Sequence, residues 1–291
     1  MRLVQLPNVN DDPTDFYYLF DFSKLVSEVE EDILVDFSQC GFLRQNAVAM
    51  LGGLARKAES RGIRLHFKWD SLTRRVKNNL RKNGFMGTFA SFASNSSGNS
   101  IPYREDLNDS PDSYIEYLKE EWLHPGWVNM SPALREAITS KVYEIYRNAF
   151  DHGLSSIGVF SCGQLYPNLS ELRLSIVDFG IGIPTEVKHY LRNHSMNASD
   201  ALSWAFKIGN TTKPSDDHGR GLGLGILKDY IKANNGILEI YSNDGYVKVT
   251  KNQEVFQNTP YFFGGTIFNI TIKQDESYYC FASEVDNDPL F

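Results

Sequence analysis

The chain has 291 residues, with 42% hydrophobic and 22% charged residues, which is the composition of a soluble globular protein. This length accommodates one large domain or two ordinary ones. The formal net charge of −7 and the pI near 5.4 argue against a general nucleic-acid binder, which would carry a basic surface.

Apolar runs and cysteines indicate the cellular setting. No apolar run reaches the roughly 18 residues that span a bilayer, and the N-terminus lacks a basic and then apolar signal, so we expect no membrane segment. Cys40, Cys162 and Cys280 lie far apart in the sequence. Free thiols in a reducing cytoplasm are therefore expected rather than a disulfide.

Residues 32–84 alternate between strand and helix patterns. The expected elements are, in chain order, a strand at 32–37, a helix at 44–61, a strand at 63–67 and a helix at 71–82 that Asn83-Gly84 ends. This order predicts an α/β domain with a parallel or mixed sheet.

This first region resembles a STAS domain, as found in anti-sigma-factor antagonists and sulfate-transporter tails. The residues that carry the resemblance are Ile33-Leu34-Val35-Asp36-Phe37-Ser38, Phe42-Leu43, the helix from Asn46, Gly62-Ile63-Arg64-Leu65 and Asn83-Gly84-Phe85. Such antagonists are phosphorylated on a serine at the start of that helix, where this chain has Arg44-Gln45-Asn46. The resemblance therefore implies a surface for docking a protein partner or for self-association. A generic α/β domain is the alternative.

The stretch from Ser91 to Ser100 is rich in Ser, Asn and Gly and reads as a linker. We therefore divide the chain into a STAS-like domain at 1–105, a second domain at 106–275 and an acidic tail at 276–291. The elements expected beyond the linker are helices at 111–123 and 132–150, strands at 157–162, 171–178, 236–242, 245–251 and 264–273, and a tail that is loosely attached or packs late.

A polar stripe runs along the helix predicted at 132–150. Ile138, Val142, Ile145 and Ala149 share its apolar face. Glu144, Asn148 and Asp151 occupy the adjacent stripe, at the edge of the core-facing side. A carboxylate and an amide oxygen there suit a water-activating base and a Mg²⁺ ligand. Taken singly, a solvated polar stripe is the simpler explanation.

Asp178 ends an apolar strand and is followed by Gly180 and Gly182. An unpaired charge at the buried end of a strand is costly. The carboxylate could accept a hydrogen bond from the exocyclic amine of adenine, and guanine presents a carbonyl at that edge. An aspartate that caps the next turn is the alternative.

Four glycines stand at every second position from Gly219 to Gly225, just before a helical run at 226–231. In a helix interior each would cost about 1 kcal/mol relative to alanine. Alternating glycines instead let a ligand approach main-chain N–H groups, and the helix N-terminus that follows suits phosphate. A hinge is the alternative. The spacing fits neither a P-loop nor the G-x-G-x-x-G pattern.

Together these motifs resemble the GHKL ATPase superfamily, which includes gyrase, the mismatch-repair and heat-shock chaperone ATPases, histidine kinases and anti-sigma-factor kinases. The matching segments, over about residues 130–273, are Glu144-x-x-x-Asn148 with His152-Gly153, Asp178-x-Gly180-x-Gly182-Ile183-Pro184, Gly219-Arg-Gly221-Leu-Gly223-Leu-Gly225 and Gly264-Gly265-Thr266-Ile267-Phe268. The resemblance implies a Bergerat-type α/β sandwich, a mixed sheet covered on one face by helices.

The resemblance also implies ATP and Mg²⁺ as cofactors and a role for each matching residue. Glu144 would be the general base, Asn148 the Mg²⁺ ligand, and Asp178 the acceptor of the adenine amine, with help from the hydroxyl of Thr266. The other residues expected at the nucleotide are Asp151, Gly180, Gly182, Ile183, Thr211, Thr212, Lys213, Gly219, Arg220, Gly221, Leu222, Gly223, Leu224 and Gly225. Residues 185–218 would form a short lid over the nucleotide.

Two functions remain open. The first is an ATPase or a Ser/Thr protein kinase of the anti-sigma-factor-kinase type that acts on a protein partner through Glu144. The second is a non-catalytic ATP sensor whose lid controls a protein interaction. A histidine kinase is disfavoured because His124, its candidate phosphoacceptor, is followed at once by Pro125 and Gly126, which break a helix.

Overall fold

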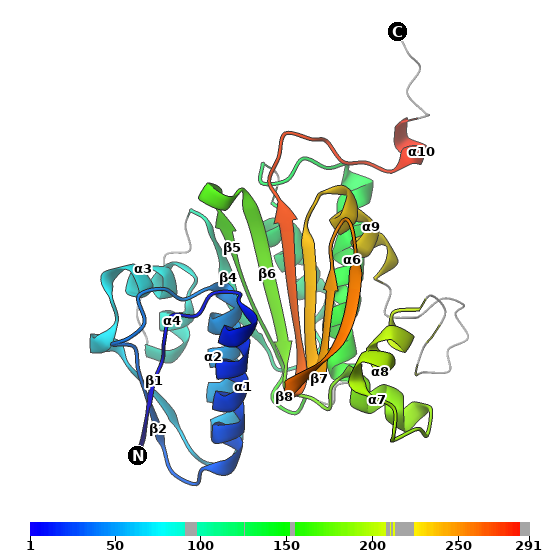
Figure 1. Ribbon diagram of the computed structural model, residues 1–291. Coiled ribbons are helices and arrows are strands. Elements are labelled where there is room, and N and C mark those ends of the chain that lie inside the picture. The colour runs from blue at the N-terminus through cyan, green and yellow to red at the C-terminus, as the bar shows by residue number, and fades with distance from the viewer. Residues whose placement is uncertain are drawn as a thin grey trace.

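The computed structural model describes residues 1–90, 98–124, 126–151, 155–207, 210, 212 and 224–285. The fold is mixed α/β and contains a three-stranded parallel sheet and a five-stranded antiparallel sheet. Two helices, α1 (Pro13–Glu28) and α2 (Gln45–Ser60), lie between the two sheets (Figure 1). The chain is therefore layered as sheet, helices, sheet, helices.

The smaller sheet has the strand order β1-β2-β3, and all its strands are parallel. Its strands are β1 (Arg2–Gln5), β2 (Ile33–Asp36) and β3 (Leu65–Lys68). The parallel arrangement predicted for 32–84 is confirmed for β2 and β3. Neither β1 nor α1 was predicted from the sequence, although Pro13 at the start of α1 is a typical first helical residue.

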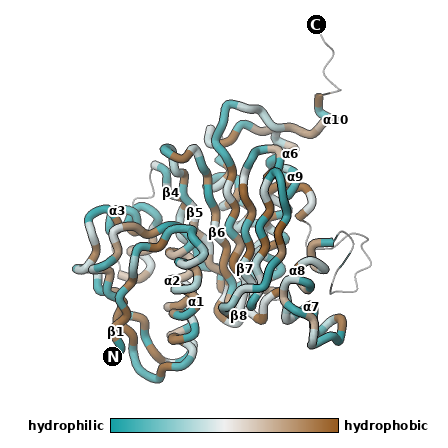
Figure 2. The backbone as a smooth tube through the Cα atoms, in the orientation of Figure 1, coloured by the Kyte–Doolittle hydropathy of each residue, from teal (hydrophilic) through white to brown (hydrophobic). Residues whose placement is uncertain are grey.

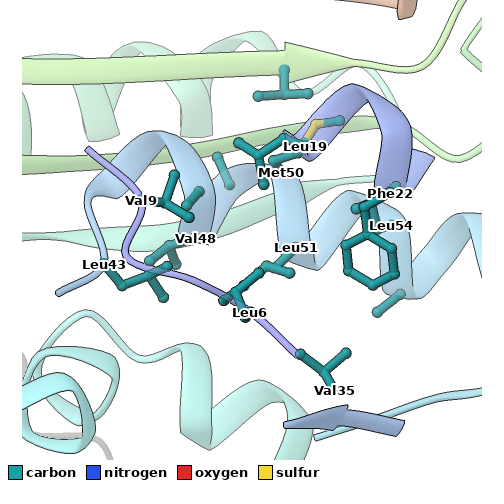
Figure 3. Close-up of a cluster of buried hydrophobic side chains, with 14 of the residues drawn as sticks. Leu6, Val9, Leu19, Phe22, Val35, Leu43, Val48, Met50, Leu51 and Leu54 are labelled. Atoms are coloured by element: carbon teal, nitrogen blue, oxygen red, sulfur yellow. The ribbon is translucent and has the colours of Figure 1, made fainter. Parts of the chain in front are cut away.

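Helix α2 is buried on nearly all sides because both sheets pack against it. Met50, Leu51 and Leu54 lie among side chains of α1 and of the small sheet, as Figure 3 shows. Its glycines Gly52 and Gly53 each make the helix about 1 kcal/mol less favourable than alanine would. A Cβ atom on Gly52 would lie 1.8 Å from the hydroxyl of Tyr103, so glycine permits the close approach of the larger sheet.

Beyond β3 the chain covers the small sheet with short elements. These are a 3-10 turn at Trp69–Ser71, α3 (Arg74–Lys82) and α4 (Phe85–Ala90). The side chain of Thr73 accepts a hydrogen bond from the amide of Val76 and so caps α3. The helix predicted at 71–82 is thus present, with a later start.

The larger sheet has the strand order β4-β5-β6-β8-β7. Its strands are β4 (Ser100–Asp106), β5 (Val159–Tyr166), β6 (Glu171–Asp178), β7 (Ile237–Val249) and β8 (Glu254–Lys273). Every neighbouring pair is antiparallel, so the predicted mixed sheet is wrong for these strands. Strand β4 starts at Ser100, so the chain joins this sheet before residue 106. Figure 2 shows hydrophobic residues along these strands.

Helices cover both faces of the larger sheet, whereas the resemblance implied one. One face packs on α1 and α2. The other packs on α6 (Pro132–Asp151) and α9 (Gly225–Ala233), and α5 (Pro111–Tyr117) with the π-helical turn Leu118–Trp122 lies beside α6. Helix α8 (Ala198–Ala205) lies within the predicted lid, and α7 (Ile183–Tyr190) begins two residues before that lid; the two helices pack against each other and β7. The last helix in the described part of the chain is α10 (Ala282–Val285).

The hydrophobic core to which a residue belongs shows on which face of the larger sheet its side chain lies. Val177, Ile267 and Phe263 belong to the core shared with α1 and α2. Leu174, Ile176 and Phe268 belong to the core beneath α6 and α9. Because side chains alternate along a strand, Asp178 and Thr266 face α6, and Phe179 faces α2.

The strands predicted at 236–242 and 245–251 form one strand, β7, with a bulge. The register shifts at Asn243, whose φ of 52° is left-handed. Asparagine tolerates this backbone better than most residues, and bulges re-aim side chains. Here Asn243 is turned toward the segment that follows β6.

The acidic tail is in contact with the rest of the chain as far as the structure describes it. The amide of Ser131 donates to the carbonyl of Tyr279 at 2.8 Å, and the hydroxyl of Ser131 donates to Glu284 at 2.8 Å. All three cysteines are free, as predicted. In the described parts of the chain, no helix has both the length and the apolar character needed to cross a membrane.

The shared core predicts that both sheets unfold together. Leu51→Ala, at a fully buried site, should lower the unfolding free energy by about 2–5 kcal/mol. Hydrogen exchange measured by mass spectrometry should then accelerate about 30-fold or more at the slowest amides of both β2 and β6. Asn78→Ala, on the exposed side of α3, is the control. Acceleration in β2 alone would contradict a shared unfolding unit.

Candidate functional site

Asp178 is the last residue of β6 and lies directly opposite Thr266 of β8. Only 6% of Asp178 is exposed, although a carboxyl group is costly to bury. No cation pairs with it among the described residues. The strand ending predicted from the sequence is therefore confirmed, and the buried acidic side chain at that point is unusual.

Burial raises the pKa of the Asp178 carboxyl to about 7. The amide of Gly180 donates to Oδ1 at 2.8 Å and lowers the pKa in part, as do the hydroxyl and the amide of Thr266. The proton of this carboxyl is thus exchanged near neutral pH. A buried carboxyl held by amide and hydroxyl groups can accept a further hydrogen bond from a ligand.

A chain of hydroxyl groups extends from Thr266 to the start of α7. The hydroxyls of Thr266 and Ser242 are 3.0 Å apart, and the amide of Ile183 donates to the Ser242 hydroxyl at 2.9 Å. Strand β7 positions Ser242 beside Thr266 in the sheet register. Ile183, predicted at the nucleotide, is thereby linked through Ser242 to Thr266 in the middle of β8.

Gly182 makes the turn into α7, with a φ of 80°. A Cβ atom there would lie 2.5 Å from Nδ2 of Asn243, so the position has neither the backbone nor the space for another residue. Asn243 in turn donates to the carbonyl of Ile181 at 3.0 Å and accepts from the amide of Thr185 at 3.0 Å. The turn after Asp178 is therefore held rigidly.

Ser242 and Asn243 are site residues that the sequence reading missed. The run Asn243-Asp244-Gly245 indicates a turn, and we read it as a break between two strands. Its polar side chains next to a predicted strand end were the signal that could have found them.

The predicted polar stripe is present on α6, beside its buried apolar face. Nζ of Lys141 lies 2.6 Å from Oε1 of Glu144, and Nε of Arg147 lies 3.1 Å from Oδ2 of Asp151. Glu144, 35% exposed at its side chain, is thus engaged by a neighbouring cation. Asn148 is half-buried, and its side chain has no hydrogen-bond partner among the described residues.

Ser155 joins the end of α6 to the turn after Asp178. Its amide donates to the carbonyl of Ala149 at 3.5 Å, and its hydroxyl accepts from the amide of Phe179 at 3.4 Å. Asn148 precedes Ala149 in the last turns of α6. The stripe therefore ends close to the buried carboxyl, although no described contact joins Glu144 or Asn148 to Asp178.

Most of the predicted phosphate loop lies outside the described residues. This applies to Thr211, Lys213, Gly219, Arg220, Gly221, Leu222 and Gly223, and to His152 and Gly153. Of the remainder, the hydroxyl of Thr212 donates to the carboxylate of Glu186 on α7. Leu224 is buried and precedes α9, which begins at Gly225, one residue before the helical run predicted at 226–231.

No set of three or more His, Cys, Asp or Glu side chains within the described ranges could hold a metal ion. A cation bound by Asn148 would therefore need further ligands such as phosphate oxygens and water, which is the usual situation for Mg²⁺. The amide oxygen of Asn148 fits that chemistry.

Comparison with models of known protein families finds no match. Comparison with curated proteins finds none either. The function is therefore argued from the residues and their geometry.

The raised pKa of Asp178 predicts how stability depends on pH. The folded protein binds a proton that the unfolded chain releases near pH 3.8, so stability should fall as pH rises from 4 to 8. Asp178→Asn should remove this fall and raise the unfolding free energy at pH 8 by up to about 4 kcal/mol. Urea unfolding at several pH values measures both effects.

Asp36→Asn is the matched control, because Asp36 is equally buried at the end of β2. The amide of Ser38 lowers the pKa of that carboxyl, so its loss should reduce stability at pH 8. The two substitutions should thus change stability in opposite directions. A loss of stability in both would contradict a raised pKa at Asp178.

Proposed function

We propose that the chain binds an adenine nucleotide with Mg²⁺ on the α6 face of the larger sheet. The observation that carries this proposal is the buried carboxyl of Asp178, which lies beside Thr266 and pairs with no cation of the residues that the structure describes. A protein retains such a group at a cost in stability, which indicates a use for it.

The base end of the proposed site is formed by Asp178, Thr266 and the turn at Gly180–Gly182. The carboxylate accepts the exocyclic amine of adenine, and the hydroxyl of Thr266 supplies a donor or acceptor beside it. Guanine, which presents a carbonyl there, would face the carboxylate with like polarity. Selection of adenine over guanine follows from this contact.

The phosphate end of the proposed site lies toward α9 and the polar stripe of α6. The first amides of α9, from Gly225 onward, have no side-chain cap and can donate to phosphate oxygens. Asn148 would hold Mg²⁺, which neutralises phosphate charge and bridges phosphate oxygens. Thr211, Thr212, Lys213 and residues 219–224 are proposed at the phosphates from the sequence motif.

Glu144 is the proposed general base, which polarises water for hydrolysis or a hydroxyl group for transfer to a protein. For this role the carboxylate must leave Lys141. The ion pair with Lys141 favours the second function, a sensor that binds ATP without turning it over. Both functions require the same nucleotide site, and they differ in whether Glu144 acts as a general base.

At the level of family, we propose a GHKL-type ATPase domain joined to a STAS-like module. The motif order and the antiparallel pairing of Asp178 with Thr266 support the first part. Three parallel strands that alternate with α1 and α2 support the second. The module's outward face, which includes α3, is available to a protein partner or to a second copy of the chain.

Nucleotide binding is measured by calorimetry with and without MgCl₂. ATP should bind more tightly with Mg²⁺, and its affinity should rise from pH 6 to pH 8 as Asp178 loses its proton. Asp178→Asn should weaken binding at pH 8 tenfold or more and remove this pH dependence. Asp36→Asn should leave binding unchanged. Equal affinity in wild type and Asp178→Asn would refute the base contact.

Phosphate release separates the ATPase from the sensor. Glu144→Ala should lower turnover by a factor of about 100 or more and leave ATP affinity within about threefold. Glu136→Ala, on an exposed position of the same helix, should change neither. No turnover in wild type, together with Mg²⁺-dependent binding, would establish the sensor instead. Radiolabel on an added protein would indicate a kinase.

A further inference from the structure

Helix α2 of the N-terminal module touches the back of the Asp178 turn. A Cβ atom on Gly53 would lie 2.1 Å from Cε2 of Phe179, the residue that follows Asp178. It would also lie 2.8 Å from the ring of Phe160 on β5. Such distances do not occur for real Cβ atoms, so Gly53 lets the Phe179 ring lie directly on the helix.

The Phe179 ring is held between aromatic side chains of the larger sheet and a lysine of α2. Its centroid lies 5.9 Å from that of Phe160 and 5.4 Å from that of Phe263, both edge to face. Nζ of Lys57, one turn along α2 from Gly53, lies 5.6 Å from the ring centroid. The ring therefore has little freedom to move without displacing its own backbone.

The backbone on the other side of the turn is equally restricted. Gly265 has a φ of 133°, and a Cβ atom there would lie 2.2 Å from the carbonyl oxygen of Asp178. Strand β8 thus crowds the peptide between Asp178 and Phe179 from one side, and α2 crowds the Phe179 ring from the other. Because both neighbours are close-packed, we expect a displacement of the ring to shift the Asp178 carboxyl as well.

We propose that Gly53 and Phe179 form a positioning contact through which helix α2 sets the place of the Asp178 carboxyl and hence the choice of base. This inference rests on the proposed function. Neither residue touches the nucleotide. The N-terminal module is then a structural part of the nucleotide site, in addition to any role in binding partners.

The neighbouring glycine provides a matched control. Gly52→Ala and Gly53→Ala change the same helix by the same atom, and both new Cβ atoms meet an aromatic side chain. Gly52 meets Tyr103 of β4, which is two strands away from β6 in the sheet. A general loss of packing should affect both variants, whereas a positioning contact should affect the site only in Gly53→Ala.

The readout is the ratio of ATP affinity to GTP affinity, which a global loss of stability does not change. Gly53→Ala should lower this ratio tenfold or more, and Gly52→Ala should leave it within about twofold. Phe179→Leu added to Gly53→Ala makes room for the new methyl group and should restore at least part of the ratio. An equal fall in both alanine variants, or no fall in Gly53→Ala, would overturn the proposal.

A second measurement needs no nucleotide. The ¹³C shift of the Asp178 carboxyl, assigned by comparison with Asp178→Asn, gives its titration midpoint in the nucleotide-free protein. The pH of this midpoint should differ from the wild-type value in Gly53→Ala and equal it in Gly52→Ala. An unmoved midpoint in Gly53→Ala would overturn the positioning contact. If wild type bound no nucleotide but the midpoint moved as expected, the proposed function would fail and the contact would stand.

If Gly53→Ala does not fold, Phe179→Leu in the wild-type background replaces it. The smaller side chain removes the ring from the groove beside Gly53 and should also lower the ATP to GTP ratio and move the midpoint. Tyr103→Phe, which removes one hydroxyl group from the same sheet face, should change neither. Equal behaviour of these two variants would overturn the proposal.

Discussion

A buried carboxyl group that pairs with no cation in the described part of the chain is the constraint on which the surrounding structure depends. Among the described residues, the amide of Gly180 and the hydroxyl and amide of Thr266 compensate Asp178 for its lost hydration. Such a group persists only where the surrounding structure holds it firmly. The two close backbone approaches, at Gly182 and Gly265, and the side chains of Ser242 and Asn243 provide that support.

Burying this carboxyl lowers the stability of the fold, and the hydrophobic core that the two sheets share offsets that cost. Helix α1 stacks Phe16 on Tyr241 at 4.4 Å and Phe20 on Phe263 at 5.2 Å, so both ends of the chain contribute to one aromatic cluster. Between α2 and β6, Gln45 donates to Ser175 at 3.3 Å, and Ser175 donates to Asn269 at 2.6 Å. This face of the larger sheet is therefore filled by side chains of α1 and α2.

The sequence predicted elements well where one periodicity persisted, and it failed where distant residues decide the structure. Helix α6 and strand β6 were found because their apolar patterns are regular. Strand β7 was split because Asn243-Asp244-Gly245 indicates a turn, yet Leu202 of α8 packs where a Gly245 side chain would be, and the strand continues. The first half of β8 was missed because it contains Pro260, which is unfavourable inside a sheet.

The candidate site shows the same difference between what a local pattern predicts and what distant residues decide. Asp178 and Thr266 could be assigned from motifs, since each stands at a fixed place on its own strand, but their pairing depends on a sheet order that local sequence does not encode. The sequence predicted the N-terminal module as a unit separate from the rest of the chain. Gly53 shows why the two are not independent in packing: glycine is unfavourable in a helix interior, and at this position the larger sheet occupies the space of a side chain. The turn after Asp178 lies in that layer, so the packing of this turn depends on a residue 125 positions before Asp178 in the chain.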